Sequence, residues 1–317
     1  MSRLPLIIVN PASAGGSTRD SWPGLASDLR THFGPFNCAF TESPGDGRRL
    51  ALRGAKDGRR FIIACGGDGT ISEVANGIME SGEPVELGIL PSGTGGDFRR
   101  TLGISTRTAA AASALRAGRT RLMDVGRIRY QNHEGETETR YFLGVASFGM
   151  SSEVIERVKE SGPGWMPGTL TNWMSGRISF ALATLQTTLW SNNTIVRLQL
   201  DEGPERRLTV ANLCVANARY FGGGMKIAPD ARLDDGRFDI ITIGDLSAMQ
   251  ILGNAPKLYF GKHLNMQQVH HTLARRLTAR PAEKETEIAI EVDGELPGRL
   301  PATFEILPGA LRVRCPV

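Results

Sequence analysis

The sequence has no long hydrophobic run and few cysteines, and each shortage excludes a class of protein. Its apolar stretches fall well short of the ~18–20 residues that a membrane-spanning helix needs. The four cysteines are far apart and form no C-x-x-C pair: Cys38, Cys65, Cys214 and Cys315. A chain of 317 residues buries a large core without disulfides. We therefore expect a reduced, cytoplasmic protein without a metal–thiolate site.

A strong excess of one charge is also missing. The chain carries 37 Lys and Arg residues against 33 Asp and Glu residues, a net charge of +4. This surplus is too small to indicate a nucleic-acid-binding protein, so no nucleic-acid partner is predicted. With 40% hydrophobic and 22% charged residues, the composition excludes a disordered chain, a collagen and a coiled coil. In contrast to these shortages, glycine is abundant and occurs at 38 positions.

Apolar runs and helical periodicity alternate along residues 1–124, which predicts an α/β domain with a parallel sheet. Continuous apolar runs are typical of strands that are covered on both faces. Gly82 and Gly118 are expected to end the two helices. Strands are predicted at residues 6–9, 61–65 and 87–90, and helices at residues 71–79 and 108–117.

The pattern changes after about Asp124, where β-branched or alternating runs are separated by turn sequences such as Asp293-Gly294. This predicts a second, mostly antiparallel domain of the β-sandwich type. The segment that holds Trp165, Trp173 and Trp190 also contains methionine and phenylalanine. We expect it to form core or an acyl pocket rather than a membrane anchor. Strands are predicted at residues 141–146, 194–200, 207–216, 238–243, 287–292 and 311–314.

Three loops rich in glycine and hydroxyl groups follow predicted strands: residues 10–16, 66–70 and 93–97. Because the carboxyl ends of parallel strands meet at one edge of a sheet, the loops should converge there, which favours a nucleotide site. Glycine lets backbone N–H groups approach a phosphate. The alternative is an ordinary turn in which Asp68 or Thr70 caps the next helix. The sequence contains neither the P-loop motif nor G-x-G-x-x-G.

The order and spacing of these loops resemble the diacylglycerol kinase catalytic domain, and most closely bacterial lipid kinases of the diacylglycerol and sphingosine kinase family. The motifs are Asn10-Pro11, Gly66-Gly67-Asp68-Gly69-Thr70 and residues 91–98, followed by Gly222-Gly223-Gly224-Met225, Pro229, Asp235-Gly236 and Asp293-Gly294-Glu295. The resemblance covers nearly the whole chain. It implies an ATP-binding α/β domain over residues 1–124, to which residues 308–317 return, and a lipid-substrate domain over residues 125–307.

The resemblance also implies the site residues. Glu295 would accept the proton of a lipid hydroxyl, with Asp68 as a second catalytic residue. Asp68 and Asp97 are candidates to hold a catalytic Mg²⁺, since this ion prefers hard oxygen ligands. A structural Mg²⁺ would bind Asp235 and the backbone carbonyls of Arg232 and Arg237. The expected ATP-binding residues are Asn10, Pro11, Ala12, Ser13, Ala14, Thr41, Gly66, Gly67, Asp68, Gly69, Thr70, Glu73, Gly93, Thr94 and Asp97.

Other interpretations remain open. Asp293-Gly294 is also a common hairpin signal, and Asp234-Asp235-Gly236 reads equally as a surface turn. Position 96 is glycine where the family pattern has asparagine, which motivates a non-catalytic nucleotide- or lipid-binding regulator. A Gly-Gly-Asp-Gly loop also occurs in NAD kinases, so a soluble acceptor is the other alternative. The favoured hypothesis is an ATP- and Mg²⁺-dependent lipid kinase that contacts the membrane surface peripherally, with a homodimer as a further expectation.

Overall fold

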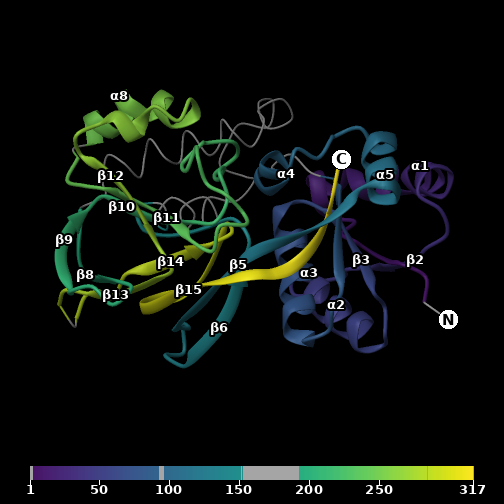
Figure 1. The fold of residues 1–317 in the computed structure, drawn as a ribbon, viewed down its shortest axis with the longest axis horizontal. Helices are drawn as coiled ribbons and strands as arrows, with labels where there is room; N and C mark the ends of the chain where they lie inside the picture. Colours follow the sequence, from purple (N-terminus) through teal and green to yellow (C-terminus); the bar gives the residue numbers. More distant parts are fainter. Residues whose placement is uncertain are drawn as a thin grey trace. The chain divides into compact units, whose positions relative to one another are not determined.

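The structure is a computed structural model that describes residues 3–92, 96–150, 152, 193–246, 248–283 and 285–316 (Figure 1). The chain divides into two compact units: Met1–Val125 together with Leu307–Val317, and Gly126–Ile306. Two long strands, β5 (Arg119–Gln131) and β15 (Glu295–Cys315), continue from one unit into the other. The tryptophan-containing segment at residues 165–190 lies outside the described residues.

The first unit contains a parallel sheet in the order β2-β1-β3-β4-β15. Its strands are β1 (Leu6–Val9), β2 (Asn37–Phe40), β3 (Phe61–Gly66), β4 (Glu86–Pro91) and the end of β15. The predicted strands at residues 6–9, 61–65 and 87–90 are confirmed as β1, β3 and β4. Strand β2 gave no apolar signal because most of its side chains are exposed at the edge of this sheet.

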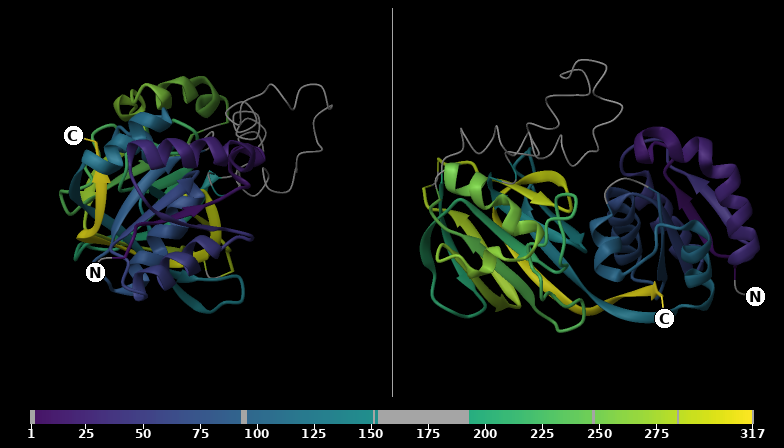
Figure 2. Two further views of the ribbon diagram at one scale, coloured as in Figure 1. Left: turned by 90° about the vertical axis from the view of Figure 1, so that its right-hand side faces the viewer. Right: turned by 90° about the horizontal axis from the view of Figure 1, so that it is seen from above.

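Helices cover both faces of this sheet. The chain moves from β1 outward to β2 and then back past β1 to β3, so right-handed crossovers place α1 opposite α2 and α3. The left view of Figure 2 shows α1 and α2 on opposite sides of the strands. Helix α3 ends at Gly82, as predicted, and Gly82 has the left-handed conformation. The helices are α1 (Ser17–His32), α2 (Asp46–Lys56), α3 (Asp68–Ser81), α4 (Asp97–Leu102) and α5 (Thr108–Ala117), with a 3-10 turn η1 (Ser13–Gly16) before α1.

Polar contacts hold the end of β15 in the first unit. The Arg314 guanidinium donates from Nε to Glu86 Oε1 at 2.6 Å and lies 4.8 Å from the centre of the Phe61 ring. The Arg314 side chain is only 21% exposed, so solvent screens this pair less than a surface pair. Gly309 donates its backbone N–H to the buried Asp124 carboxylate at 2.8 Å. These contacts hold the end of β15 in the first unit, where it pairs with β4.

The second unit is mostly antiparallel and sandwich-like, as predicted. One row of strands runs β12-β11-β10-β7-β14-β15, and β13, β8 and β9 extend from β15, while β5 pairs with β15 and β6. Its strands besides β5 and β15 are β6 (Thr137–Phe142), β7 (Val145–Gly149), β8 (Thr194–Leu200), β9 (Arg206–Val210), β10 (Asn212–Ala216), β11 (Phe238–Ile243), β12 (Val269–Ala274), β13 (Arg276–Pro281) and β14 (Ala289–Val292).

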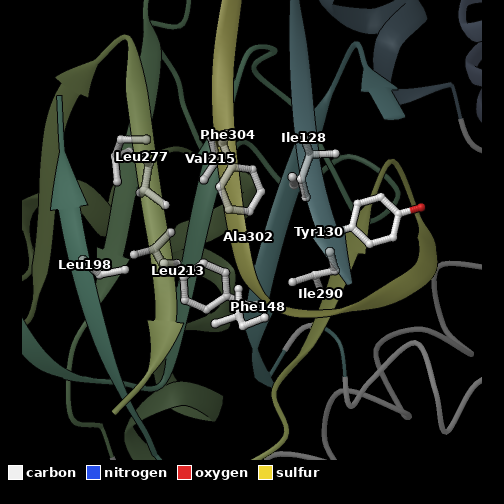
Figure 3. Close-up of a cluster of buried hydrophobic side chains, with 14 of the residues drawn as sticks. Ile128, Tyr130, Phe148, Leu198, Leu213, Val215, Leu277, Ile290, Ala302 and Phe304 are labelled. Atoms are coloured by element: carbon white, nitrogen blue, oxygen red, sulfur yellow. The ribbon is translucent and has the colours of Figure 1, made fainter. Parts of the chain in front are cut away.

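A large apolar cluster fills the interior of this unit (Figure 3). Phe142 stacks on Phe238, with 5.5 Å between ring centres, and meets Phe304 edge-on. Every residue of β7 and β10 is buried, because a second cluster around Cys214 and Ile241 covers their other face. Burial of this much apolar surface is the main stabilising contribution to the unit.

Two of the predicted strands were wrong in extent. The run at residues 141–146 is divided because Leu143 and Gly144 donate their N–H groups to the Asp293 carboxylate instead of a strand partner. The run at residues 207–216 is divided at Ala211, where the chain leaves β8 and joins β7 and β11. The predicted strand at residues 311–314 is the last part of the 21-residue β15.

A helix, α8 (Ala248–Tyr259), and a 3-10 turn, η2 (His263–Asn265), follow β11. In the portion of the chain that the structure describes, every helix falls short of the length and hydrophobicity needed to cross a membrane.

Candidate functional site

The first candidate site lies where the strand order of the parallel sheet reverses. The neighbours β1 and β3 continue into helices on opposite faces, α1 and α3. The loops that follow these two strands therefore lie at the carboxyl edge of the sheet, at the switch point where open α/β sheets bind ligands. The loops at this point are residues 10–16 and 66–70, two of the three predicted nucleotide-binding loops.

Side-chain hydrogen bonds join the first loop to the glycine loop. Asn10 donates from Nδ2 to Thr70 Oγ1 at 3.0 Å, and its Oδ1 accepts the Ala12 N–H at 2.9 Å. Ser13 Oγ donates to the Asn10 carbonyl at 2.7 Å. Ala14 has a positive φ of 55°, so the chain turns sharply here before α1. Asn10 thus fixes both its own loop, in which Pro11 also lies, and the start of α3.

The third loop joins the same edge. Ser92 donates its N–H to the Gly66 carbonyl at 3.0 Å, and its hydroxyl bonds to that of Thr18. Thr18 in turn bonds to Ser13 Oγ at 2.8 Å. The predicted convergence of the three loops is therefore confirmed for the described residues. Gly93 and Thr94 lie outside them.

The glycines of the second loop fall into two kinds. A side chain on Gly66 would overlap that of Thr70, so Gly66 is required by packing within the loop. Gly67 and Gly69 have ordinary φ values, and a Cβ on either would have no described atom within 4 Å. Nothing in the described part of the chain therefore requires glycine at these two positions. They lie at the start of a 14-residue helix, whose first N–H groups lack partners within the helix and suit an approaching anion.

Asp68 connects the glycine loop to the third loop. Its Oδ2 accepts the N–H groups of Gly96 at 2.7 Å and Asp97 at 3.0 Å, and its Oδ1 accepts that of Phe98 at 3.3 Å. Asp68 thus caps α4 rather than its own helix. The start of a helix stabilises a carboxylate, so the charge of Asp68 has a partner in the protein itself.

The space beside Gly96 is filled by Arg99. Gly96 has a φ of +82°, and a Cβ there would lie 2.9 Å from Arg99 Nε. Arg99 also donates to the Ile104 carbonyl at 2.9 Å, and the neighbouring Arg100 donates to Asp97 Oδ1 at 2.6 Å. A guanidinium group therefore occupies the position of the side chain that Gly96 lacks.

Glu73 and Thr41 also lie in the first unit, and both have structural partners. The two Glu73 carboxylate oxygens accept the N–H groups of Gly45 at 2.8 Å and Gly47 at 2.9 Å, at the start of α2. Thr41 is buried and donates its N–H to the Val9 carbonyl at 2.9 Å. The structure thus directs the Glu73 carboxylate toward α2.

A second candidate site is the hairpin turn between β14 and β15 in the second unit. Asp293 and Gly294 both have positive φ values, 48° and 88°, and Val292 pairs with Glu295. This is the type I′ geometry that Asp-Gly favours, so the turn interpretation of these residues is confirmed. The Asp293 carboxylate accepts the N–H groups of Leu143 at 3.0 Å and Gly144 at 2.9 Å.

Glu295 directly follows this turn. Its Oε2 pairs with Arg140 Nη2 of β6 at 2.6 Å, and the two side chains are 41% and 17% exposed. The better buried Arg140 orients the carboxylate, which remains accessible to solvent. A held, accessible carboxylate is the arrangement that a general base requires.

Glu291 lies beneath the same turn and is 4% exposed. Its Oε1 accepts the Gly294 N–H at 2.6 Å, and Oε2 accepts a hydrogen bond from Ser147. Burial raises the pKa of Glu291 to about 7, and the nearby negative charge of Asp293 acts in the same direction.

The loop at residues 232–237 was predicted to bind a structural metal. Asp235 Oδ1 accepts the Arg237 N–H at 3.1 Å, and the exposed Arg232 pairs with Asp234 at 3.5 Å. No cluster of three or more acidic, histidine or cysteine side chains that could hold a metal occurs among the described residues. The predicted site would instead use one carboxylate and two backbone carbonyls.

The residues around this loop fit a cation. Burial raises the pKa of the Asp239 carboxyl, the His271 hydrogen bond at 2.7 Å opposes this, and the negative charges of Asp235 and Asp230 raise the pKa further. The negative charges of Asp235 and Asp230 thus oppose ionisation of Asp239, and a cation bound at Asp235 would relieve this repulsion.

Arg140, Glu291 and Arg99 were missed in the sequence. Arg140 and Glu295 are 155 positions apart, so their pairing has no local signal. Glu291 lies between Ile290 and Val292 in an alternating run, which predicts an outward, solvated side chain. Of the three, only Arg99 had a signal in the sequence: the glycine at position 96, which leaves space for a neighbouring side chain.

Comparisons with known proteins agree with this geometry. Residues 5–128 match the family model of the diacylglycerol kinase catalytic domain, and residues 146–315 match that of the YegS C-terminal NAD kinase beta sandwich-like domain. The chain belongs to the diacylglycerol kinase family with a YegS-type C-terminal domain, because the two matches together span nearly the whole chain and the second alone spans more than half of it. The predicted family is thus confirmed.

Individual relatives carry the same name. The chain is 30% identical to a diacylglycerol kinase of Bacillus subtilis (strain 168), over 83% of this chain and 80% of the relative. It is 28% identical to one of Staphylococcus saprophyticus, over 100% of this chain and 96% of the relative. A solved diacylglycerol kinase structure from Bacillus anthracis str. Sterne has a TM-score of 0.71 at 21% identity, covering 99% of this chain and 97% of the other. At that identity the likeness shows the fold alone.

Proposed function

We propose that this protein is an ATP-dependent lipid kinase, which transfers the terminal phosphoryl group of ATP to a lipid hydroxyl. The observation that carries the proposal is the set of three loops held together at the strand-order reversal of the first unit. Membership of the diacylglycerol kinase family supports it. The first unit would bind ATP, and the second unit, Gly126–Ile306, would bind the lipid.

The residues of the first unit would bind the phosphates mainly through backbone groups. The N–H groups at the start of α3, around Gly67 and Gly69, would supply donors for the phosphate oxygens, because the first N–H groups of a helix have no partner within it. Asn10 and Asp68 hold the neighbouring loops in place, so the donors keep their positions. Arg99 adds positive charge where the family pattern has an asparagine. Phosphoryl transfer depends mostly on such positioning and charge neutralisation.

Two Mg²⁺ sites belong to the proposal. When bound, Mg²⁺ neutralises charge that develops on the phosphate oxygens. We assign Asp68 and Asp97 to hold that ion directly or through water, since both offer carboxylate oxygens at the phosphate loops. We assign the structural ion to Asp235 with the carbonyls of Arg232 and Arg237. The support is that the negative charge of Asp235 raises the pKa of the buried Asp239, a repulsion that a cation at Asp235 would relieve.

Glu295 would remove the proton from the lipid hydroxyl. A hydroxyl is a weak nucleophile, and a carboxylate within hydrogen-bonding reach can take its proton as the phosphoryl group is transferred. The support is that Glu295 is exposed enough to meet a substrate while Arg140 fixes its orientation. Arg140 would then act as a positioning residue.

The protein would bind its lipid substrate at a membrane surface. At the end of α8, Phe260 is 74% exposed and Tyr259 is 39% exposed. Lys257 and Lys262 are exposed beside them. Aromatic side chains flanked by lysines are typical of peripheral contacts with anionic membranes. These residues support a docking contact that leaves the protein outside the hydrocarbon core.

The proposal is tested by phosphate transfer from labelled ATP to several acceptors in parallel. Diacylglycerol, a sphingoid base and ceramide are presented in phosphatidylglycerol vesicles, NAD is offered in solution, and products are identified by mass spectrometry. We expect labelled phosphate in a lipid product and none in NAD. Transfer to NAD alone would favour the soluble-acceptor kinase. ATP binding without transfer to any acceptor would favour the regulator.

A further inference from the structure

We infer that Glu291 is a positioning residue for Glu295, acting through the hydrogen bond that it accepts from the backbone of the Asp293-Gly294 turn. The inference rests on the proposed function, in which Glu295 takes the proton of the acceptor hydroxyl. It concerns a residue outside every motif described above.

Contacts from two sides fix the turn. Asp293 binds the connection between β6 and β7 through the N–H groups of Leu143 and Gly144. Glu291 binds the other turn residue, at 2.6 Å from Oε1 to the Gly294 nitrogen. Gly294 immediately precedes Glu295, so a change in its orientation moves the first residue of β15. The two carboxylates therefore determine where the Glu295 backbone begins.

Glu291 is itself held rigidly. It belongs to the central strand β14, pairs in register with Ser147 of β7, and accepts that residue's hydroxyl hydrogen bond. Cys214 of β10 is the next residue along the same row. Burial and the Glu291 charge both raise the pKa of the Cys214 thiol, so this neighbour stays neutral. The charged group that acts on Glu291 is Asp293, whose negative charge raises the pKa of Glu291.

A buried carboxyl group at this position calls for an explanation other than stability. An apolar side chain would fill the same space without the desolvation penalty of an acid. What an apolar side chain could not do is accept the Gly294 N–H. The hydrogen bond to the turn is thus the distinctive contribution of Glu291, and its donor Gly294 directly precedes Glu295.

Three substitutions separate the hydrogen bond from charge and packing. Glu291→Gln keeps the size and can present its oxygen to Gly294 and its amide to Ser147. Glu291→Asp keeps the charge but shortens the side chain and withdraws the acceptor. Glu291→Met keeps the volume and removes the acceptor. Glu305→Gln is the control, because Glu305 lies on β15 and pairs with Arg127 away from the turn.

We expect Glu291→Gln and Glu305→Gln to keep kcat within about twofold of the unsubstituted protein, because the acceptor of Gly294 is preserved in both. Glu291→Asp and Glu291→Met should lose kcat by about 10- to 100-fold, because small misplacements of a reacting group cost that much. The KM for ATP should not change, because the nucleotide loops are untouched. Folding of each variant is checked by its melting temperature.

Amide hydrogen exchange at Gly294 provides a readout that does not depend on activity. The Gly294 N–H should stay protected in the unsubstituted protein and in Glu291→Gln. Wild-type kcat in a folded Asp or Met variant would overturn the inference, as would fast Gly294 exchange in a fully active Glu291→Gln protein. Failure of the proposed function is distinguishable, because the unsubstituted protein would then phosphorylate no lipid whatever the state of this turn.

Discussion

The carboxylate of Asp68 and the backbone of Gly96 are 28 residues apart in the chain and joined by a 2.7 Å hydrogen bond. Asp68 also accepts the N–H of Asp97 at 3.0 Å, so one side chain at the start of α3 closes the start of α4. A carboxylate in a glycine-rich loop suggests a metal ligand or a proton acceptor. Here it also has a structural partner, which makes its removal a test with two readouts.

Asp68→Ala should remove phosphate transfer and also lower the free energy of unfolding by about 1–3 kcal/mol, because charged helix-capping hydrogen bonds are lost. Asp68→Asn keeps one acceptor oxygen and should lose less stability. Urea denaturation and transfer assays on the same preparations measure both effects. Glu80→Ala, which removes a surface pair with Arg48, is the control. A fully stable and fully active Asp68→Ala protein would contradict the assignment.

Glu73 tests whether a residue assigned to ATP acts through the fold. Its carboxylate accepts the N–H groups of Gly45 and Gly47, so Glu73→Ala should destabilise the first unit by about 1–3 kcal/mol. Glu73→Gln should cost less, since one oxygen acceptor remains. ATP affinity is then measured well below the melting temperature of each variant. An unchanged stability with lost ATP affinity would mean that Glu73 binds the nucleotide directly.

Asp235→Asn should abolish the stabilisation by Mg²⁺ that the proposed structural site predicts. Ion binding to the folded state raises the melting temperature by mass action, and the effect disappears with the binding site. Thermal unfolding with and without Mg²⁺ measures this shift. Asp234→Asn is the matched control, because Asp234 pairs with Arg232 on the same loop. Equal Mg²⁺-induced shifts in both variants and in the unsubstituted protein would remove the site.

Glu291 predicts a specific dependence of stability on pH. Its pKa is raised to about 7 in the folded protein, whereas an unfolded chain ionises near the ordinary value of about 4.3. Between these values the folded state holds more protons, so the free energy of unfolding falls as the pH rises. Ionising Glu291 should cost up to about 3 kcal/mol across this range.

Glu291→Gln should remove this dependence, because an amide does not ionise. The measurement is urea denaturation of both proteins from pH 5 to pH 8. The substituted protein should gain stability relative to the unsubstituted one as the pH rises. A stability difference that stays constant over the range would mean that Glu291 ionises normally in the folded protein.

The sequence predicted the parts of the fold that have a local signal. The strands β1, β3 and β4 are continuous apolar runs. Gly82 ends α3, as expected for a glycine that follows a helical pattern. Strand β15 was predicted only at its end, because prolines and glycines interrupt its earlier residues. Strand β5 was missed because it carries several charged residues.

The candidate site divides in the same way. The loops and the Asp-Gly turn could be predicted, because glycine at a sharp turn has a local conformational reason. The partners of Asp68 and Glu295 could not, because they are distant in sequence. Glu291 is buried although it alternates with core residues, since its strand lies between β7 and β15 in the interior of the sheet.

The central claim is that this chain transfers phosphate from ATP to a lipid with Glu295 as the proton acceptor. The most direct measurement compares lipid phosphorylation, ATP affinity and melting temperature of Glu295→Gln with those of the unsubstituted protein. We predict a loss of kcat of about 10²- to 10⁴-fold, with ATP affinity and melting temperature preserved. Transfer above a tenth of the original rate, or a lower melting temperature that accounts for the loss, would contradict the claim and leave Glu295 as a residue of the turn.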